Sequence, residues 1–166
     1  MKILFLDIDG VIKADVHGSP FFDDSLDILK SILDRTGAVI VMSSSWKVKY
    51  KAFVDNGYKT DIYDVQRLYE ALCRHGLTIT DYTQYLGEID RTLRRPTEIK
   101  EYLKSAKDVE SFCILDDRDE FLWNELSENL VLTLFGKDEN GEKIAYLAPE
   151  HEDRIVEILN KSVKHS

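Results

Sequence analysis

The amino-acid sequence predicts an α/β protein with a doubly wound, mostly parallel sheet. Four short apolar runs are almost continuous, which is typical of strands buried on both faces of a parallel sheet. These runs are residues 3–7, 38–42, 112–116 and 130–135. Because segments with helical spacing separate them, right-handed crossovers should place helices on both faces of the sheet. A chain of 166 residues is short for two cores, so we expect one domain, residues 1–166.

The first predicted helix covers residues 24–37, DSLDILKSILDRTG. Asp24 or Ser25 is suited to the N-cap, and Gly37 is suited to end the helix in a left-handed conformation. We expect the apolar face of this helix to cover the sheet. Four side chains at helical spacing form that face: Leu26, Leu29, Ile32 and Leu33.

Three later segments show the same apolar spacing, at residues 65–72, 99–106 and 155–159. Pro96 and Pro149 precede the last two segments. Both prolines suit the first turn of a helix, where the missing backbone N–H costs little.

A β-hairpin is predicted near the end of the chain. Asn140-Gly141 is a preferred pair for a tight hairpin turn, and it would join the strand at residues 130–135 to the segment KIAYLA. The segment TITDYTQYL, residues 78–86, gives no clear pattern of helix or strand.

Composition and charge exclude several classes of function. The formal net charge is −9, from 22 basic and 31 acidic residues, which argues against a broad nucleic-acid-binding surface. No apolar run approaches the roughly 20 residues that span a bilayer, and the N-terminal run is too short and too acidic for a secretion signal. Cys73 and Cys113 lie within a helical and a strand-like pattern. We therefore expect reduced cysteines, no disulfide-linked partner, no membrane association and a cytoplasmic location.

Polar residues follow the predicted strands at their carboxyl ends, where doubly wound sheets bind ligands. They are Asp7 and Asp9, then Ser43, Ser44 and Ser45, then Asp116 and Asp117, with Arg94 and Arg95 opening a helix between the last two groups. Two carboxylates about 4 Å apart repel by roughly 4 kcal/mol at an effective dielectric constant near 20. We therefore expect a hard divalent cation among them, and Mg²⁺ fits this set of oxygen ligands.

Four of these segments resemble the motifs of the haloacid dehalogenase-like (HAD) hydrolases, most of which are Mg²⁺-dependent phosphatases. The segments are DIDGV, VIVMSSSW, RRPTEI and FCILDDRDE, and they span about residues 3–120. The SSSW and RxxEI details are similar to a small capless group of HAD domains associated with RNA-repair proteins. The sequence departs from that group at Lys47 and Pro96, where Arg and Gly are expected.

The resemblance implies a Rossmann-like HAD fold and a role for each acidic residue. Asp7 would be the nucleophile that forms an aspartyl-phosphate. Asp9 would protonate the leaving oxygen and later activate water. Four groups would ligate Mg²⁺: Asp7, the backbone carbonyl of Asp9, Asp116 and Asp117.

Hydroxyl and basic side chains would hold the phosphoryl oxygens. Ser43, or Ser44 if the strand runs one residue longer, would donate hydrogen bonds to them. Arg95 would neutralise charge in the transition state, with Arg94 as the alternative. Lys47 lies close to these residues in the sequence and is also expected at the phosphate. The serines could instead cap the next helix, and Arg95 could be a solvated surface residue.

The absence of a long insertion bears on the substrate. Neither the segment after the first strand nor that between Lys47 and Arg94 is long enough for a sizeable cap domain. An open site favours a phosphomonoesterase for a bulky substrate or a terminal phosphate, such as a nucleotide or an RNA end. Trp46 is either a core residue or a wall of this site.

Two other functions remain open. The chain could be a catalytically idle HAD domain that binds a phosphorylated partner or metabolite. It could also be a phospho-receiver domain, but that class needs a lone aspartate in mid-chain and a lysine near the end of the sheet. Here a serine run and a second acidic pair occupy those strand ends.

Overall fold

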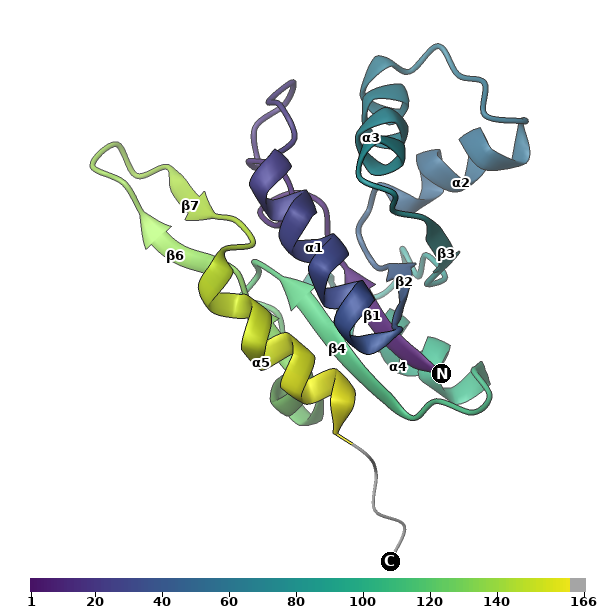
Figure 1. The fold of residues 1–166 in the computed structure, drawn as a ribbon, viewed down its shortest axis with the longest axis vertical. Coiled ribbons are helices and arrows are strands. Elements are labelled where there is room, and N and C mark those ends of the chain that lie inside the picture. Colours follow the sequence, from purple (N-terminus) through teal and green to yellow (C-terminus); the bar gives the residue numbers. More distant parts are fainter. Residues whose placement is uncertain (162–166) are drawn as a thin grey trace, which may run out of the picture.

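The computed structural model describes residues 1–161 and contains a five-stranded sheet in the order β3-β2-β1-β4-β5 (Figure 1). All neighbouring strands are parallel, which confirms the predicted α/β class. Strands β1 and β4 are far apart in the sequence and pair at the centre of the sheet. The strands are β1 (Lys2–Leu6), β2 (Val39–Met42), β3 (Ile79–Tyr82), β4 (Ser111–Asp116) and β5 (Leu130–Leu132).

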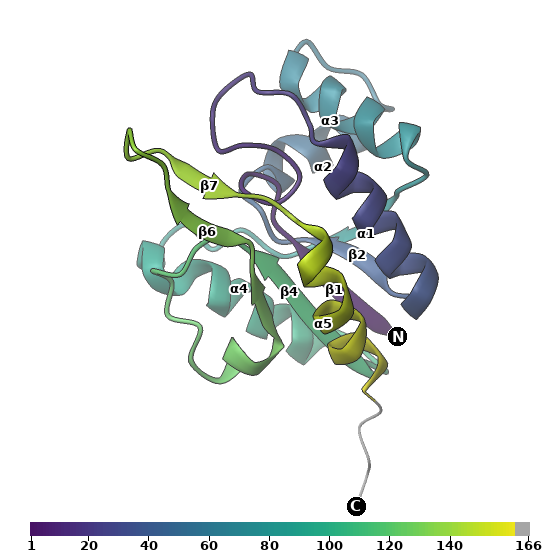
Figure 2. The ribbon, with the colours of Figure 1, turned by 60° about the vertical axis from the view of Figure 1, so that its left-hand side comes forward.

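Helices cover both faces of the sheet (Figure 2). One face carries α1 and α5, and the other carries α4 with a short 3₁₀ helix. Helices α2 and α3 follow β2 and lie near the edge strand β3. The helices are α1 (Asp23–Thr36), α2 (Lys47–Asp55), α3 (Tyr63–Arg74), α4 (Arg91–Ser105) and α5 (Pro149–Asn160), and the 3₁₀ helix is Asn124–Asn129.

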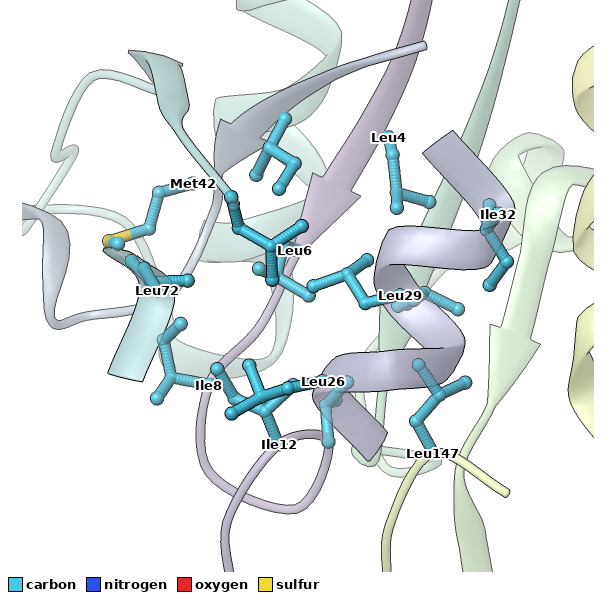
Figure 3. Packing of buried hydrophobic residues seen from close by; sticks show 14 of the residues in the cluster. Leu4, Leu6, Ile8, Ile12, Leu26, Leu29, Ile32, Met42, Leu72 and Leu147 are labelled. Atoms are coloured by element: carbon cyan, nitrogen blue, oxygen red, sulfur yellow. The ribbon is translucent and has the colours of Figure 1, made fainter. Parts of the chain in front are cut away.

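The larger core lies between β1, β2 and α1. Figure 3 shows Leu6 of β1 and Leu26 and Leu29 of α1 converging in this layer. Each of these side chains is fully buried, and such burial stabilises a fold by about 1.5–3 kcal/mol per side chain. The predicted apolar face of α1 is therefore confirmed, although Leu33 is only partly buried.

Helix α1 begins one residue earlier than expected. Its N-cap is Phe22, which supplies no side-chain hydrogen bond, so the assignment of Asp24 or Ser25 as the cap was wrong. The Ser25 hydroxyl donates instead to the Leu147 carbonyl at 2.8 Å and ties α1 to the chain before α5. Gly37 ends the helix in the left-handed region, with φ 72°, as predicted.

Helix α4 also begins earlier than predicted, at Arg91. The carboxylate of Asp90 accepts a hydrogen bond from the Thr92 N–H and caps the helix, so Pro96 lies inside it and not in its first turn. Proline cannot donate to the carbonyl four residues back, and the Leu122 N–H donates to that Thr92 carbonyl at 2.9 Å. This bond joins α4 to the chain that follows β4. Pro149 opens α5, as expected.

The sheet has one strand more than the sequence indicated. Residues 79–82 form β3 at the edge, where Asp81 and its neighbour Thr80 are exposed, so the strand lacks an apolar run. The predicted strand at 130–135 divides at Thr133. Its first half, β5, joins the sheet, and its second half begins β6 (Leu134–Lys137), which pairs with β7 (Lys143–Ala145) as the predicted hairpin.

The connections leave the carboxyl ends of the strands without a cap domain among the described residues. Residues 12–22, which we call the flap, link β1 to α1 and lie beside α3 in both ribbon views (Figures 1 and 2). The β6–β7 hairpin stands on the other side of the flap (Figure 2). Within residues 1–161 no helix has the length and apolar character needed to cross a membrane.

Candidate active site

Three aspartates meet where β1 and β4 end. Asp7 directly follows β1, Asp116 closes β4, and Asp117 is the next residue. Because β1 and β4 are paired in parallel, with Leu6 opposite Leu115, both strand ends lie at one edge of the sheet. One carboxylate oxygen from each aspartate lies within 4.8 Å of the others, and all three residues are buried. The structure thus brings together three of the four predicted metal-binding residues.

Two side-chain cations already face these carboxylates. Arg95 of α4 places Nη1 2.8 Å from Asp116 Oδ2 and 3.1 Å from Asp7 Oδ2. Lys143 of β7 places Nζ 2.7 Å from Asp117 Oδ2. Part of the positive charge that the sequence argument assigned to a metal therefore comes from the chain itself. Lys143 was missed, because it lies on a hairpin outside the alternating strands and helices that mark the site.

Burial nevertheless disfavours the charged forms of these carboxyl groups. It raises the pKa of Asp7 to about 6, against the opposing effect of Arg95. Burial likewise raises the pKa of Asp117 to about 6, with the nearby charge of Asp7 acting in the same direction. The pKa of Asp116 is also raised by burial, although Arg95 opposes this. Three such groups would be ionised together more easily beside a further positive charge.

Gly10 permits the close approach of Asp117 to the turn after β1. A Cβ atom built at residue 10 would lie 2.0 Å from Asp117 Oδ2, and the backbone there has φ +80°, which L side chains rarely adopt. The Thr133 hydroxyl donates to the Gly10 carbonyl at 2.6 Å and fixes the turn against β5. The glycine in DIDGV is thus required by both the space and the backbone conformation.

The side chain of Asp9 lies outside the group of three aspartates. Its Oδ1 accepts a hydrogen bond from Lys13 Nζ at 2.8 Å, and its Oδ2 accepts one from Trp46 Nε1 at 3.0 Å. Lys13 is itself buried and donates to two backbone carbonyls of the flap. Sequence reasoning missed Lys13, whose only signal was its position four residues after Asp9. The expected ligation through the Asp9 backbone carbonyl stays a prediction.

The serines after β2 differ in what they contact. Ser43 is fully buried, and its hydroxyl has no hydrogen-bond partner within residues 1–161. Ser44 is also buried, but its hydroxyl accepts from the Trp46 N–H at 3.2 Å near the start of α2. A buried hydroxyl without a partner is costly unless a ligand satisfies it. Of the two serines, Ser43 is therefore the one whose buried hydroxyl has no partner of any kind among the described residues.

The two arginines of α4 also differ in position. Arg95 reaches the carboxylates, whereas Arg94 donates to the backbone carbonyls of Gly87 and Ile89 at 3.2 Å each. The Arg94 guanidinium also lies over the ring of Tyr85. Arg94 thus holds the loop before α4, and Arg95 is the one that lies against Asp7.

Lys47 is buried in a polar cluster at the start of α2. Its Nζ lies 2.7 Å from Glu98 Oε1 and 3.0 Å from Thr83 Oγ1. Glu98 also accepts from the Leu86 N–H, so the pair joins α2, α4 and the loop after β3. Burial lowers the pKa of Lys47, and Glu98 opposes that change. Lys47 also lines a small cavity together with Ser43 and Arg95, and phosphate binding by Lys47 stays a prediction.

A pair of glycine substitutions tests the close approach at Gly10. Gly10→Ala should destabilise the fold and weaken any binding of Mg²⁺, because its Cβ would displace Asp117. Gly18→Ala is the matched control, since its φ is +76° and nothing lies within 4 Å of an added Cβ. Each variant bears the cost of a left-handed L residue, about 1–2 kcal/mol, which urea denaturation would measure. Equal losses in the two variants would contradict the steric argument.

Comparison with known proteins agrees with the geometry. The family model described as the HAD domain in Swiss Army Knife RNA repair proteins matches residues 3–137. Searches of curated proteins and of solved structures returned no significant match. The matched range contains all four motif segments, and therefore Asp7, Ser43, Arg95 and Asp116. The chain belongs to this family of small HAD domains.

Proposed function

We propose that this protein is a Mg²⁺-dependent phosphomonoesterase that acts through an aspartyl-phosphate on Asp7. The observation that carries the proposal is the convergence of Asp7, Asp116 and Asp117, with one oxygen of each within 4.8 Å of the others. Membership of the HAD family supports hydrolase chemistry in general. The free Ser43 hydroxyl and the Arg95 guanidinium add the donors that phosphoryl oxygens need.

The residues present fit a magnesium ion. The three side chains offer oxygen only, which suits a hard cation, and Asp117 Oδ1 is buried without a hydrogen-bond partner among the described residues. Asp7, Asp116 and Asp117 would hold the ion with the backbone carbonyl of Asp9. When bound, Mg²⁺ supplies positive charge to the phosphoryl oxygens.

Asp7 and Asp9 would carry the two halves of the reaction. A carboxylate oxygen of Asp7 attacks phosphorus, the ester P–O bond breaks, and the leaving oxygen takes a proton from Asp9. Asp9 then takes a proton from water as that water attacks the phosphorus of the aspartyl-phosphate. Phosphate leaves and the Asp7 carboxylate is restored. Lys13 and Trp46 orient the Asp9 side chain by hydrogen bonds to its two oxygens.

A small cavity beside these residues suits the phosphoryl group. It has a volume of about 160 Å³, and its wall includes Ser43, Lys47 and the arginines Arg91, Arg94, Arg95 and Arg118. The Ser43 hydroxyl would donate to one phosphoryl oxygen. As Asp7 forms the covalent bond to phosphorus, the Arg95 guanidinium would interact less with Asp7 and more with the phosphoryl oxygens.

The substrate we propose is a phosphorylated nucleotide or RNA end. The fold carries no cap domain over the strand ends in residues 1–161, so a large substrate has access. The matching family is named for RNA repair proteins, which supports the same class. A cytoplasmic location belongs to this proposal, and the free cysteines Cys73 and Cys113 agree with a reducing compartment.

A second candidate function is a HAD domain that binds a phosphorylated partner without turnover. The ion pairs of Arg95 with Asp7 and of Lys143 with Asp117 favour it, because they neutralise both carboxylates without a metal. The presence of both Asp7 and Asp9 favours the enzyme. Metal binding and turnover decide between the two.

A magnesium titration of the melting temperature tests the metal site. At pH 7.5 and a hundredfold excess over its dissociation constant, Mg²⁺ should stabilise the protein by about 2.7 kcal/mol, or roughly 5–10 °C. The pKa of Asp7 and of Asp117 is about 6, above the usual 3.8, so protons compete with the ion below pH 6 and the shift should shrink at pH 5. Asp117→Asn should abolish the shift, and the exposed Asp119→Asn should keep it. A melting temperature independent of Mg²⁺ would reject the site.

Turnover of p-nitrophenyl phosphate tests the two-step mechanism. Asp7→Asn should leave a folded protein that releases no p-nitrophenol, because the nucleophile is lost. Asp9→Asn should release about one equivalent in a burst and then stall, because this leaving group needs no proton but the second step needs a base. Steady turnover at the wild-type rate in either variant would show that another residue carries the reaction.

Paired substitutions decide between neighbouring phosphate-binding candidates. Ser43→Ala and Arg95→Lys should each lower kcat/KM by about a hundredfold to a thousandfold, the range for losing a donor to the transition state. Ser44→Ala and Arg94→Lys are the matched controls, and they should retain most of the activity at a temperature where all four variants are folded. If Ser44→Ala lowered kcat/KM more than Ser43→Ala, Ser44 would be the phosphate-binding serine. A larger loss from Arg94→Lys than from Arg95→Lys would likewise assign that role to Arg94.

A further inference from the structure

A second, larger cavity opens beside Asp9. Its volume is about 520 Å³, within the range of small-molecule sites, and it lies between the flap and the helices α2 and α3. We call it the flap cavity. Asp9 lies in its wall, and Ser45 lines both this cavity and the small one that contains Ser43 and Arg95. The two cavities therefore adjoin at Ser45, and Asp9 lies on the side of the flap cavity.

In-line phosphoryl transfer decides what each cavity would receive. The attacking oxygen of Asp7 and the leaving oxygen lie on opposite sides of phosphorus, and the leaving oxygen must come within hydrogen-bond reach of Asp9. Lys13 and Trp46 fix the Asp9 carboxylate, and both also line the flap cavity. The group attached to the leaving oxygen must therefore extend from Asp9 into the flap cavity.

Helix α3 holds the flap, which forms one wall of the flap cavity, in place. Arg67 donates to the backbone carbonyls of Gly18 at 3.5 Å and Ser19 at 3.3 Å, and its guanidinium lies over the ring of Phe21. The flap and α3 are thus joined side by side, as the ribbon views show (Figures 1 and 2). Although the fold has no cap domain in the described residues, these contacts give the leaving group a bounded site.

The chemistry of the walls differs between the two cavities. The small cavity is rich in arginine, whereas the flap cavity combines the Trp46 indole with the aliphatic side chains of Ile62 and Val65. Its cations are few. The ammonium of Lys13 already has three acceptors, and Lys49 is exposed at the rim. The walls therefore suit a neutral, partly aromatic group more than a second cluster of phosphates.

We propose that the flap cavity binds the nucleoside that carries the phosphate. This inference rests on the proposed function and specifies its substrate. The base would pack against Trp46 and Ile62. Asp15 and Asp64 line the same wall and already face Arg118 and Arg67, but each carboxylate has further acceptor positions for hydroxyl or amino groups. Lys49 would meet the next phosphate of an oligonucleotide. A sugar phosphate has no base that could pack against the apolar residues of this wall.

Binding to the Asp7→Asn protein tests the proposal without turnover. In the presence of Mg²⁺, calorimetry should show adenosine 3′-monophosphate binding about tenfold more tightly than ribose 5-phosphate, the size expected when a base stacks on an aromatic side chain. Adding Trp46→Leu should remove this advantage, and adding Trp46→Phe should keep most of it. Equal affinities for the two probes would overturn the proposal. Tighter binding of a phosphoserine peptide would assign the cavity to a protein partner and overturn it too.

A second pair of variants keeps the test decisive if Trp46→Leu does not fold. Lys49 lines the flap cavity, whereas Lys51, also exposed on α2, does not. In the Asp7→Asn background, Lys49→Ala should weaken a 3′-phosphorylated dinucleotide by about threefold and leave adenosine 3′-monophosphate unchanged. Lys51→Ala should change neither. If Lys49→Ala and Lys51→Ala had the same affinity for the dinucleotide, the proposed position of its second phosphate beside Lys49 would be wrong.

The outcome is separable from that of the proposed function. Hydrolysis of p-nitrophenyl phosphate without any preference for nucleotides would overturn only the role of the flap cavity. A Trp46-dependent preference for nucleotides in a protein that hydrolyses nothing would support the cavity and reject the phosphatase.

Discussion

The site depends on the confinement of three buried carboxylates at the paired ends of β1 and β4. Asp7 is far from Asp116 and Asp117 in the sequence. The parallel pairing of β1 with β4 places all three side chains together at one edge of the sheet. Desolvation makes this costly, as the pKa values of about 6 for Asp7 and Asp117 indicate. Nearby positive charge would stabilise the ionised forms of these carboxylates, and this is the basis of the proposed metal binding.

Much of the surrounding structure serves this confinement. Gly10 removes the side chain that would collide with Asp117, and Thr133 fixes the Gly10 carbonyl. Pro96 leaves the Thr92 carbonyl free for the Leu122 N–H, which draws the chain after β4 against the helix that presents Arg95. These contacts are local, yet together they determine where three carboxylates and one guanidinium can lie.

The fold and the acidic residues could be predicted because strand ends are visible in the sequence. Apolar runs that stop at Asp7, Ser43 and Asp116 identify the edge of a parallel sheet, and ligands bind there. The partners of these residues could not be predicted in the same way. Lys143 reaches Asp117 only because a hairpin outside the sheet turns back over it, and Lys13 reaches Asp9 through the path of the flap.

Some local sequence signals gave a wrong prediction of where a helix begins or failed to indicate that a strand forms. Pro96 resembles a helix start, but the Asp90 cap begins α4 earlier and the Leu122 N–H makes an internal proline tolerable. The polar edge strand β3 has no apolar run, because only part of its surface is buried. The Leu122 N–H lies far from Pro96 in the sequence, where periodicity does not reach, whereas Asp90 is a local cap that the capping rules could have identified.

The most direct test of the central claim is a crystal structure of the protein with Mn²⁺ and beryllium fluoride, which mimics a phosphorylated aspartate. The anomalous signal of the metal locates the ion independently of the protein coordinates. We expect one ion bound by Asp7, Asp116 and Asp117, with beryllium fluoride on Asp7 and facing Ser43. An ion bound elsewhere, or carboxylates that turn away from one another, would contradict the account.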